Sequence, residues 1–264
     1  MIAAFGPSLR YRWLLWSFAR REIANRFRGS VTGALWAVLH PLALLAIFSA
    51  VFTLVFRVKL PDTMAGTSYA TVVALALWPW MMFSEALTRG LAAIAANGDL
   101  IRKVAFPHRL LVYASVLVSF AIHGVGFLAV LLALKAMGEP VALAGLPAAL
   151  LLLVPLALIA IGLAAALAAL HTLMRDVEPF VTIVLTIVFY ATPVLYLAEQ
   201  APPELRSWID ANPLGHLLGR IRSVLLEGGF LTAGDLVIAA VALAVAVAGL
   251  AFFERLSPFF EDFL

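Results

Sequence analysis

The sequence predicts an all-α membrane protein with six transmembrane helices, an N-terminal interfacial amphipathic helix and short re-entrant helices before the last span. Of its 264 residues, 64% are hydrophobic and only 12% are charged, about half of the ~25% usual in soluble domains. The mean hydropathy is +1.05. A soluble fold could not bury so much apolar surface, and the low charge excludes a disordered or nucleic-acid-binding chain.

Six apolar windows are long enough to cross the ~30 Å of hydrocarbon in a bilayer. They are residues 33–56, 69–87, 110–137, 143–170, 180–197 and 236–253. Pro79 and Glu85 interrupt the second window. The fifth window has 18 residues, which span only ~27 Å at ~1.5 Å per residue. We expect residues 1–264 to form a single transmembrane domain.

The distribution of basic residues predicts the orientation of the chain. An even number of spans places both termini on one side of the membrane. With that side inside, the internal segments hold twelve of the eighteen Lys and Arg residues and the external segments hold six. Because internal loops are enriched in Lys and Arg, we expect both termini to be cytoplasmic.

Residues 8–30 are predicted to form a helix that lies in the cytoplasmic interface. Apolar residues recur every four positions from Leu15 to Phe27, and arginines occupy the opposite arc. One interpretation is a topology signal that contacts anionic lipids. The other is a docking place for a phosphate-bearing substrate, because Arg binds phosphate oxygens in bidentate fashion. The candidate phosphate-binding residues are Arg20, Arg21, Arg26 and Arg28.

Aromatic residues are spaced at multiples of four along the first span, and a Thr and Tyr stripe follows one face of the fifth. Lipid packing is one interpretation, and bonds from Thr hydroxyls to their own helix are another. The functional hypothesis is a channel lining, because aromatic faces can stack on sugar rings. Its candidate residues are Trp36, Phe48, Phe52, Thr186, Tyr190 and Tyr196.

Glu85 and His123 are ionisable residues inside apolar windows. We expect Glu85 to pair with Arg89 at the cytoplasmic headgroups, since Glu followed by Arg four residues later is a favourable helical order. A role in the pathway is the alternative. We interpret His123, which is alone in the middle of its window, as a residue satisfied within the bundle, and a proton relay is the alternative.

The internal loop 88–109 predicts a short helix at 92–103. Asn97-Gly98-Asp99 interrupts the chain, and Asp99 can cap the helix that follows. A solvated connector is one interpretation. Mixed apolar and basic residues also suit docking of a partner protein, and the candidate residues are Asp99, Leu100, Ile101, Arg102 and Lys103.

The external stretch 198–235 contains two short helix signals. Leu205, Trp208 and Ile209 share one face of the first. Asn212 followed by Pro213 marks the start of the second, as an N-cap with Pro at the first helical position. We expect both to dip back into the membrane, and Trp208, Asn212 and Pro213 are candidate gate residues.

Motifs for catalysis are missing from the sequence. It has no cysteine and no G-x-x-x-x-G-K-[ST] phosphate loop, and its five histidines lack metal-ligand spacing. We therefore expect no catalytic residue, no metal site and no cofactor in this chain, which is not predicted to hydrolyse ATP itself.

In their order along the chain, several short segments resemble the permease subunits of type-2 ABC exporters that move bacterial polysaccharides. Each segment is short, but together they cover about residues 20–229. They are Arg21-Glu22-Ile23 with Arg26-Phe27, Gly33-Ala34-Leu35-Trp36 with Pro41, Trp78-Pro79-Trp80 with Phe83-Ser84-Glu85, Asn97 to Lys103 with Phe106-Pro107, Arg175-Asp176-Val177, Thr192-Pro193-Val194-Leu195-Tyr196 and Asn212-Pro213-Leu214.

This resemblance implies a homodimer in the bacterial cytoplasmic (inner) membrane, with two copies of a separate cytoplasmic ATPase that bind ATP and Mg. It implies that 92–103 is the coupling helix seated in that ATPase and that 198–235 holds two gate helices. The implied substrate is a lipid-linked polysaccharide, O-antigen-like and carried on undecaprenyl pyrophosphate. The Phe-Pro and Thr-Pro segments are closer to the O-antigen and teichoic-acid branch than to the capsule branch.

Other functions remain open at this stage. Within transporters, the chain could be a permease for teichoic acid, capsule, a drug or a small lipid. Outside them, the alternatives are a membrane-embedded lipid-modifying enzyme and a structural scaffold. An ATPase that co-purifies with the chain and depends on it would favour the exporter.

Overall fold

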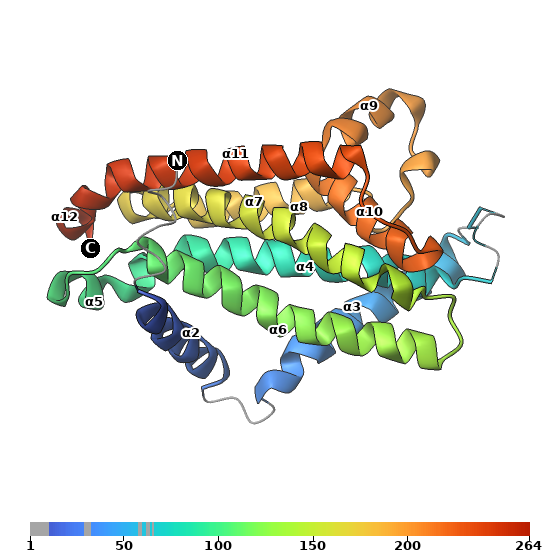
Figure 1. Ribbon diagram of the computed structural model, residues 1–264, viewed down its shortest axis with the longest axis horizontal. Coiled ribbons are helices and arrows are strands. Elements are labelled where there is room, and N and C mark those ends of the chain that lie inside the picture. Colours follow the sequence, from blue (N-terminus) through green and yellow to red (C-terminus); the bar gives the residue numbers. More distant parts are fainter. Residues whose placement is uncertain (1–10, 29–32, 58–59, 62–63, 65) are drawn as a thin grey trace.

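The computed structural model describes residues 11–28, 33–57, 60–61, 64 and 66–264. These residues form helices and no strand, which confirms the all-α fold class. Figure 1 shows the longest helices running side by side along one axis. Five helices of the described chain are long and apolar enough to cross a membrane, at Val38–Val55, Tyr69–Ala92, Arg109–Ala136, Leu143–Leu173 and Ala233–Phe263.

These spans are built from α3 (Trp36–Ala50) with the π-helical turn η3 (Val51–Val55), α4 (Tyr69–Ala92), α6 (Arg109–Ala136), α7 (Leu146–Leu173) and α11 (Ala233–Leu256). The predicted helix at 8–30 is α2 (Arg12–Phe27), and its predicted ends at 8–10 and 29–30 lie outside the described residues. The shorter helices are α5 (Gly98–Lys103), α8 (Val177–Ala191), α9 (Pro203–Ala211), α10 (Pro213–Glu227) and α12 (Phe260–Phe263).

The fifth predicted window, 180–197, overlaps α8, which is an apolar helix of 15 residues that begins earlier, at Val177. It ends at Ala191, where the window extends to 197. Thr192 takes an extended backbone with φ −101° and ψ 136°, as expected for a residue that precedes proline. The five residues after Thr192 continue without an α-helix, and their backbone groups need partners elsewhere.

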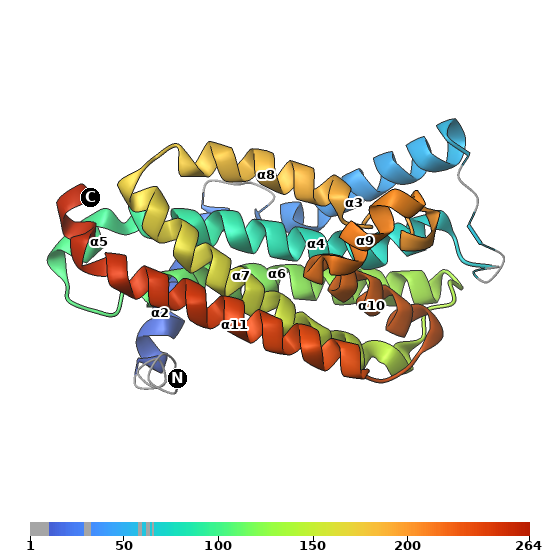
Figure 2. The same cartoon turned by 90° about the horizontal axis from the view of Figure 1, so that it is seen from above.

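The core of the bundle is α4. In its apolar window, 78% of the residues are buried inside the protein, against 11–44% in the other four spans. Figure 2 shows α4 between α3 and α8 on one side and α6, α7 and α11 on the other. Trp78 and Phe83 are among its fully buried side chains. This helix contacts α3, α6, α7, α8 and α10, and the site described below is built around it.

The helices α7 and α11 cross at a pair of glycines. A Cβ atom placed on Gly249 would overlap the backbone of Gly162, and one placed on Gly162 would overlap the backbone at Val245 and Ala246. Only glycine permits this approach of the two backbones. Small residues at such contacts are what allow membrane helices to pack closely.

The carboxylate of Glu139, in the loop after α6, anchors the start of α4. Its Oε2 accepts a hydrogen bond from the Ser68 backbone N–H at 3.0 Å. Ser68 is also the N-cap of α4, because its Oγ accepts from the Thr71 N–H at 3.2 Å. Burial raises the pKa of the Glu139 carboxyl, but the hydrogen bonds from Ser68 and Thr71 outweigh it and hold that pKa below its usual value.

We expect Glu139→Gln to lower the free energy of unfolding by about 1 kcal/mol at pH 7, because a neutral amide oxygen accepts a weaker hydrogen bond than a carboxylate oxygen does. The folded-state pKa is depressed, so the carboxylate stabilises the fold above the unfolded-state pKa of ~4.3. That stabilisation disappears as the pH falls through the folded-state pKa. Thermal unfolding in lipid nanodiscs at pH 7 and pH 3 measures it, with the exposed Glu204→Gln as control. An equal effect of Glu139→Gln at both pH values would contradict the prediction.

Candidate functional site

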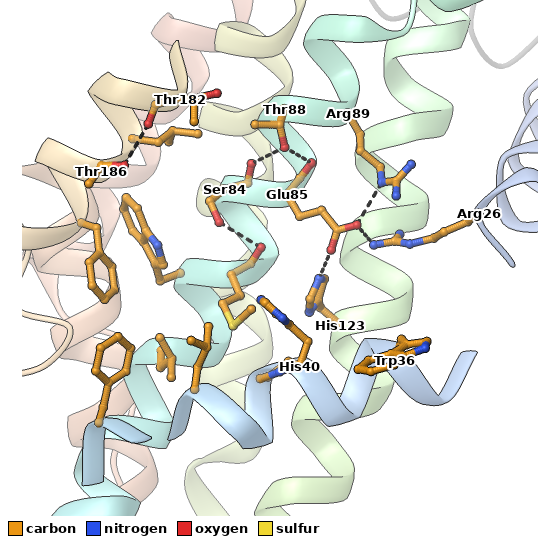
Figure 3. A pocket seen from close by; sticks show the side chains of 18 of the residues that line it. Arg26, Trp36, His40, Ser84, Glu85, Thr88, Arg89, His123, Thr182 and Thr186 are labelled. Carbon is orange, nitrogen blue, oxygen red and sulfur yellow. Dashed lines mark hydrogen bonds and ion pairs between the residues drawn. The ribbon is translucent and has the colours of Figure 1, made fainter. Parts of the chain in front are cut away.

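A cavity of about 670 Å³ lies among α2, α3, α4, α6 and α8. The half nearer to α10 is aromatic. The rings of Phe48 and Phe189 lie 6.0 Å apart, and those of Trp80 and Phe189 lie 5.5 Å apart. The half nearer to α5 is polar and charged, with Ser84, Glu85, Thr88 and Arg89 of α4, Arg26 of α2 and His123 of α6 (Figure 3). One cavity therefore offers aromatic faces and charged groups together.

The charged half is organised by Glu85, whose carboxylate contacts three side chains. Arg26 of α2 forms an ion pair with Oε1, and Arg89 Nε donates to Oε1 at 3.0 Å. His123 Nε2 contacts Oε2. The predicted pairing of Glu85 with Arg89 is confirmed. His123 finds a partner within the bundle at Nε2, as predicted, because the fold brings α6 against α4 at this level.

Four residues of this region are called the charge cluster below: Glu22, Arg26, Glu85 and Arg89. Besides the contacts of Glu85, Arg89 Nη1 lies 3.6 Å from Glu22 Oε1. The formal charges of the two acidic and two basic side chains sum to zero. This balance reduces the cost of placing charges beside apolar helices, since buried charges are tolerated when they are paired.

The α5 end of the bundle presents the predicted docking segment. The side chain of Ile101 is buried and anchors α5, whereas Asp99, Arg102 and Lys103 are exposed and Leu100 is half-buried. The C-terminal residue Leu264 lies against Gly98. The expectation that Asp99 caps this helix is wrong. Asn97 occupies the N-cap position, and Asp99 lies in the first turn, where a carboxylate is favoured by the helix dipole.

At the opposite end, Asn212 begins α10 as predicted. Its Oδ1 accepts from the Leu214 N–H at 3.0 Å, and Pro213 occupies the first turn. Its Nδ2 also donates to Thr192 Oγ1 at 2.9 Å, which ties α10 to the end of α8. On α9, Trp208 is 77% exposed whereas Ile209 is 6% exposed. The face that they were expected to share is therefore only partly buried.

Arg222 of α10 is a structural residue that the sequence analysis missed. It is 4% exposed. Its Nη2 donates to the carbonyls of Pro193 and Val194 at 2.8 and 3.0 Å, and its Nη1 donates to that of Tyr196 at 3.1 Å. These are carbonyls of the non-helical segment after α8. Arg222 lies four residues after Leu218, on the apolar and buried face of α10. An arginine on an apolar face was the signal in the sequence that could have identified it.

Comparison with known proteins identifies the family. A family model described as ABC-2 type transporter matches residues 14–226. The chain belongs to the ABC-2 type transporter family. It is thus a component of a membrane transporter, and the resemblance inferred from the short segments is confirmed.

Several relatives of this ABC-2 chain are similar over most of their length. The O-antigen export system permease protein RfbA of Myxococcus xanthus is 32% identical over 235 residues, which cover 86% of this chain and 85% of the relative. RfbA of Klebsiella pneumoniae is 26% identical over 252 residues and 95% of each chain. The polysialic acid transport protein KpsM of Escherichia coli is 23% identical over 208 residues and 79% of each chain.

The ABC-2 fold brings some of the predicted lining residues together and separates others. Trp36, Phe48, Thr186 and Tyr190 line the cavity. Phe52 instead stacks on Tyr69, with ring centroids 5.6 Å apart, and the Tyr196 hydroxyl donates to the Tyr190 carbonyl at 3.2 Å. The Thr186 hydroxyl donates to the Thr182 carbonyl at 3.0 Å, so it bonds within its own helix as the alternative interpretation proposed.

Only one of the four predicted phosphate-binding arginines lines the cavity. Arg26 lines the cavity, with only 7% of its side chain exposed. Arg20, Arg21 and Arg28 are exposed and do not line it. Their predicted role in phosphate binding, and that of the lining, docking and gate residues in transport, stays a prediction.

Proposed function

We propose that this chain is the membrane-spanning permease of an ATP-driven exporter that carries a lipid-linked, O-antigen-like polysaccharide across the bacterial cytoplasmic membrane. The observation that supports this most is the mixed chemistry of the 670 Å³ cavity. Its aromatic half suits sugar rings, and Arg26 suits the pyrophosphate of an undecaprenyl carrier. The two RfbA relatives, whose names describe O-antigen export, support the same substrate class.

The working unit in this proposal is a homodimer. The outer face of α8 is apolar and uncovered, with Phe180, Ile183, Ile187 and Tyr190 all 62–64% exposed. The neighbouring first span has only 11% of its window buried. One chain of this size cannot enclose a polymer, and a second copy related by a twofold axis would complete the pathway between the α3 and α8 helices.

Energy is supplied in this proposal by two copies of a separate cytoplasmic ATPase, which bind ATP and Mg. The α5 surface of Asp99, Arg102 and Lys103 contacts them, and Ile101 transmits their movement into the bundle. The α5 end and both termini are then cytoplasmic, and α9 and α10 form the external gate with Trp208, Asn212 and Pro213.

Removing one aromatic face of the cavity is expected to slow glycan export. Stacking is worth ~0.5–1.5 kcal/mol per aromatic partner, so Tyr190→Ala or Phe48→Ala should lower the flux roughly two- to tenfold. Surface glycan is measured in a strain whose own copy of this chain is deleted, together with lipid-linked glycan retained inside.

The matched control is Phe252→Ala. This aromatic residue lies on α11 and is 40% exposed, but it neither lines the cavity nor belongs to the uncovered face of α8. Phe252→Ala is expected to export at the wild-type rate. Wild-type flux for both cavity variants would refute the aromatic lining, and failure of the wild-type chain to restore surface glycan would refute the substrate class.

A further inference from the structure

The charge cluster joins two helices by reciprocal ion pairs. Glu22 and Arg26 are four residues apart on α2, and Glu85 and Arg89 are four residues apart on α4. Each acid of one helix faces a base of the other. Figure 3 shows Arg26 reaching from α2 toward Glu85 at the edge of the cavity. The cluster therefore connects the cavity directly to the position of α2.

Glu85 does not depend on Arg26 for its hydrogen bonds. Arg89 donates to Oε1 at 3.0 Å, and His123 contacts Oε2. If Arg26 moved away, both carboxylate oxygens would keep a partner. Breaking a buried ion pair usually carries a penalty, which comes from the charge left unpaired. For Glu85 this penalty would be small.

Arg26 has donor capacity that its present contacts do not use. Its side chain is 7% exposed, and its Nη1 has no hydrogen-bond partner among the described residues. A guanidinium carries five N–H donors and binds phosphate through two of them at once. A phosphate in the cavity would satisfy this buried nitrogen, which Glu85 does not.

The two halves of α2 are attached to the bundle in different ways. In the first half, Leu14, Leu15 and Phe18 pack against the core, and the Phe18 ring lies 5.2 Å from that of Phe106. In the second half, Ile23 is 38% exposed and Asn25 is also exposed. The charge cluster provides the ion pairs that tie this half to α4.

We propose that a phosphate of the lipid carrier takes Arg26 from Glu85, so that filling the cavity releases the second half of α2 from α4. This proposal rests on the proposed function. Glu85 is then a positioning residue, which holds Arg26 beside the empty cavity. The exchange conserves charge pairing, because phosphate replaces carboxylate at Arg26 while Arg89 and His123 remain on Glu85.

The absence of native cysteine allows a direct measurement of this movement. Spin labels are placed on the exposed positions Asn25→Cys and Asp176→Cys of the full chain in lipid nanodiscs. Undecaprenyl pyrophosphate is expected to produce a second distance population. Labels at Arg12→Cys and Asp176→Cys, which report the first half of α2, should not respond. Undecaprenol tests the lipid tail alone, and inorganic pyrophosphate tests the free anion.

Binding affinities separate positioning from a purely structural role. If Glu85 competes with phosphate for Arg26, Glu85→Gln should bind undecaprenyl pyrophosphate roughly tenfold more tightly, the factor that ~1.4 kcal/mol of lost competition gives. It should also show the second distance population without lipid. Arg26→Gln should bind more weakly. Glu254→Gln, which removes an acid paired with Arg109 of α6 outside the cavity, is the matched control and should keep the wild-type affinity.

The outcomes distinguish the release of α2 from the proposed function. Lipid binding without a change in the Asn25 distance would overturn the release and leave the export function standing. No binding of undecaprenyl pyrophosphate would overturn the release together with the role of Arg26 in substrate binding. Weaker binding by Glu85→Gln would overturn the competition between carboxylate and phosphate. The wild-type measurement remains decisive even if Glu85→Gln fails to fold.

Discussion

Arg222→Gln is expected to destabilise the protein by about 3 kcal/mol or more and to abolish transport. The three carbonyls that Arg222 satisfies belong to Pro193, Val194 and Tyr196. Each buried polar group left without a partner costs ~1–3 kcal/mol. A glutamine has one amide group and is shorter, so it cannot reach all three. Backbone outside a helix is tolerated at membrane depth only where protein groups or water satisfy it.

The matched control for this substitution is Arg206→Gln in α9. Arg206 also donates to backbone carbonyls, those of Glu199 at 2.8 Å and Ala201 at 3.2 Å, but its side chain is exposed. Water can replace it, and a loss below ~1 kcal/mol is expected. Thermal unfolding of both variants in nanodiscs gives the comparison. Equal losses would show that burial of the guanidinium is not what makes Arg222 important.

Reversing the charge of Arg102 and Lys103 together is expected to leave the chain folded and to stop export. Both side chains are exposed on α5, whereas Ile101, at 2% exposure, anchors the helix. Under the proposed function, Arg102→Glu with Lys103→Glu reverses the charge that α5 presents to the partner ATPase, and mismatched charges at an interface cost several kcal/mol. We expect at least a roughly hundredfold loss of glycan flux, equivalent to ~2.7 kcal/mol.

Surface glycan in cells and the amount of ATPase that co-purifies with the chain measure this effect. Arg255→Glu is the control, because Arg255 is also basic and exposed but lies at the end of α11. It should export normally. Full export by the double variant would refute the docking role of α5, and poor expression of the double variant alone would show instead that these side chains support the fold.

Local features of the fold were predictable from the sequence. Long apolar windows predict spans because a lipid-facing helix must be apolar over its whole length. Asn212 and Pro213 mark the start of α10 because a cap and a proline act within one turn. The Glu85 and Arg89 pair was also predictable, since residues four apart share a helix face.

The partners of the cavity residues could not be predicted in the same way. Arg26 and His123 meet at Glu85 although His123 is 38 positions away in the chain. Arg222 binds carbonyls 26 to 29 positions away. Such contacts depend on how α2, α6 and α10 pack around α4, and no local spacing encodes that. Asp99 was misassigned because α5 already begins at Gly98, so that Asp99 lies inside its first turn.

The burial of α4 has a consequence for how the chain is made. Its mean hydropathy is 1.4, compared with 2.3–2.8 for the other four spans, because contact with protein replaces contact with lipid over most of its surface. Yet α4 is synthesised before α6, α7 and α10, which cover it. A newly inserted α4 therefore exposes Glu85 and its less apolar faces to lipid until the later helices arrive. Stable insertion of α4 is therefore expected to depend on α6, α7 and α10, which are made after it.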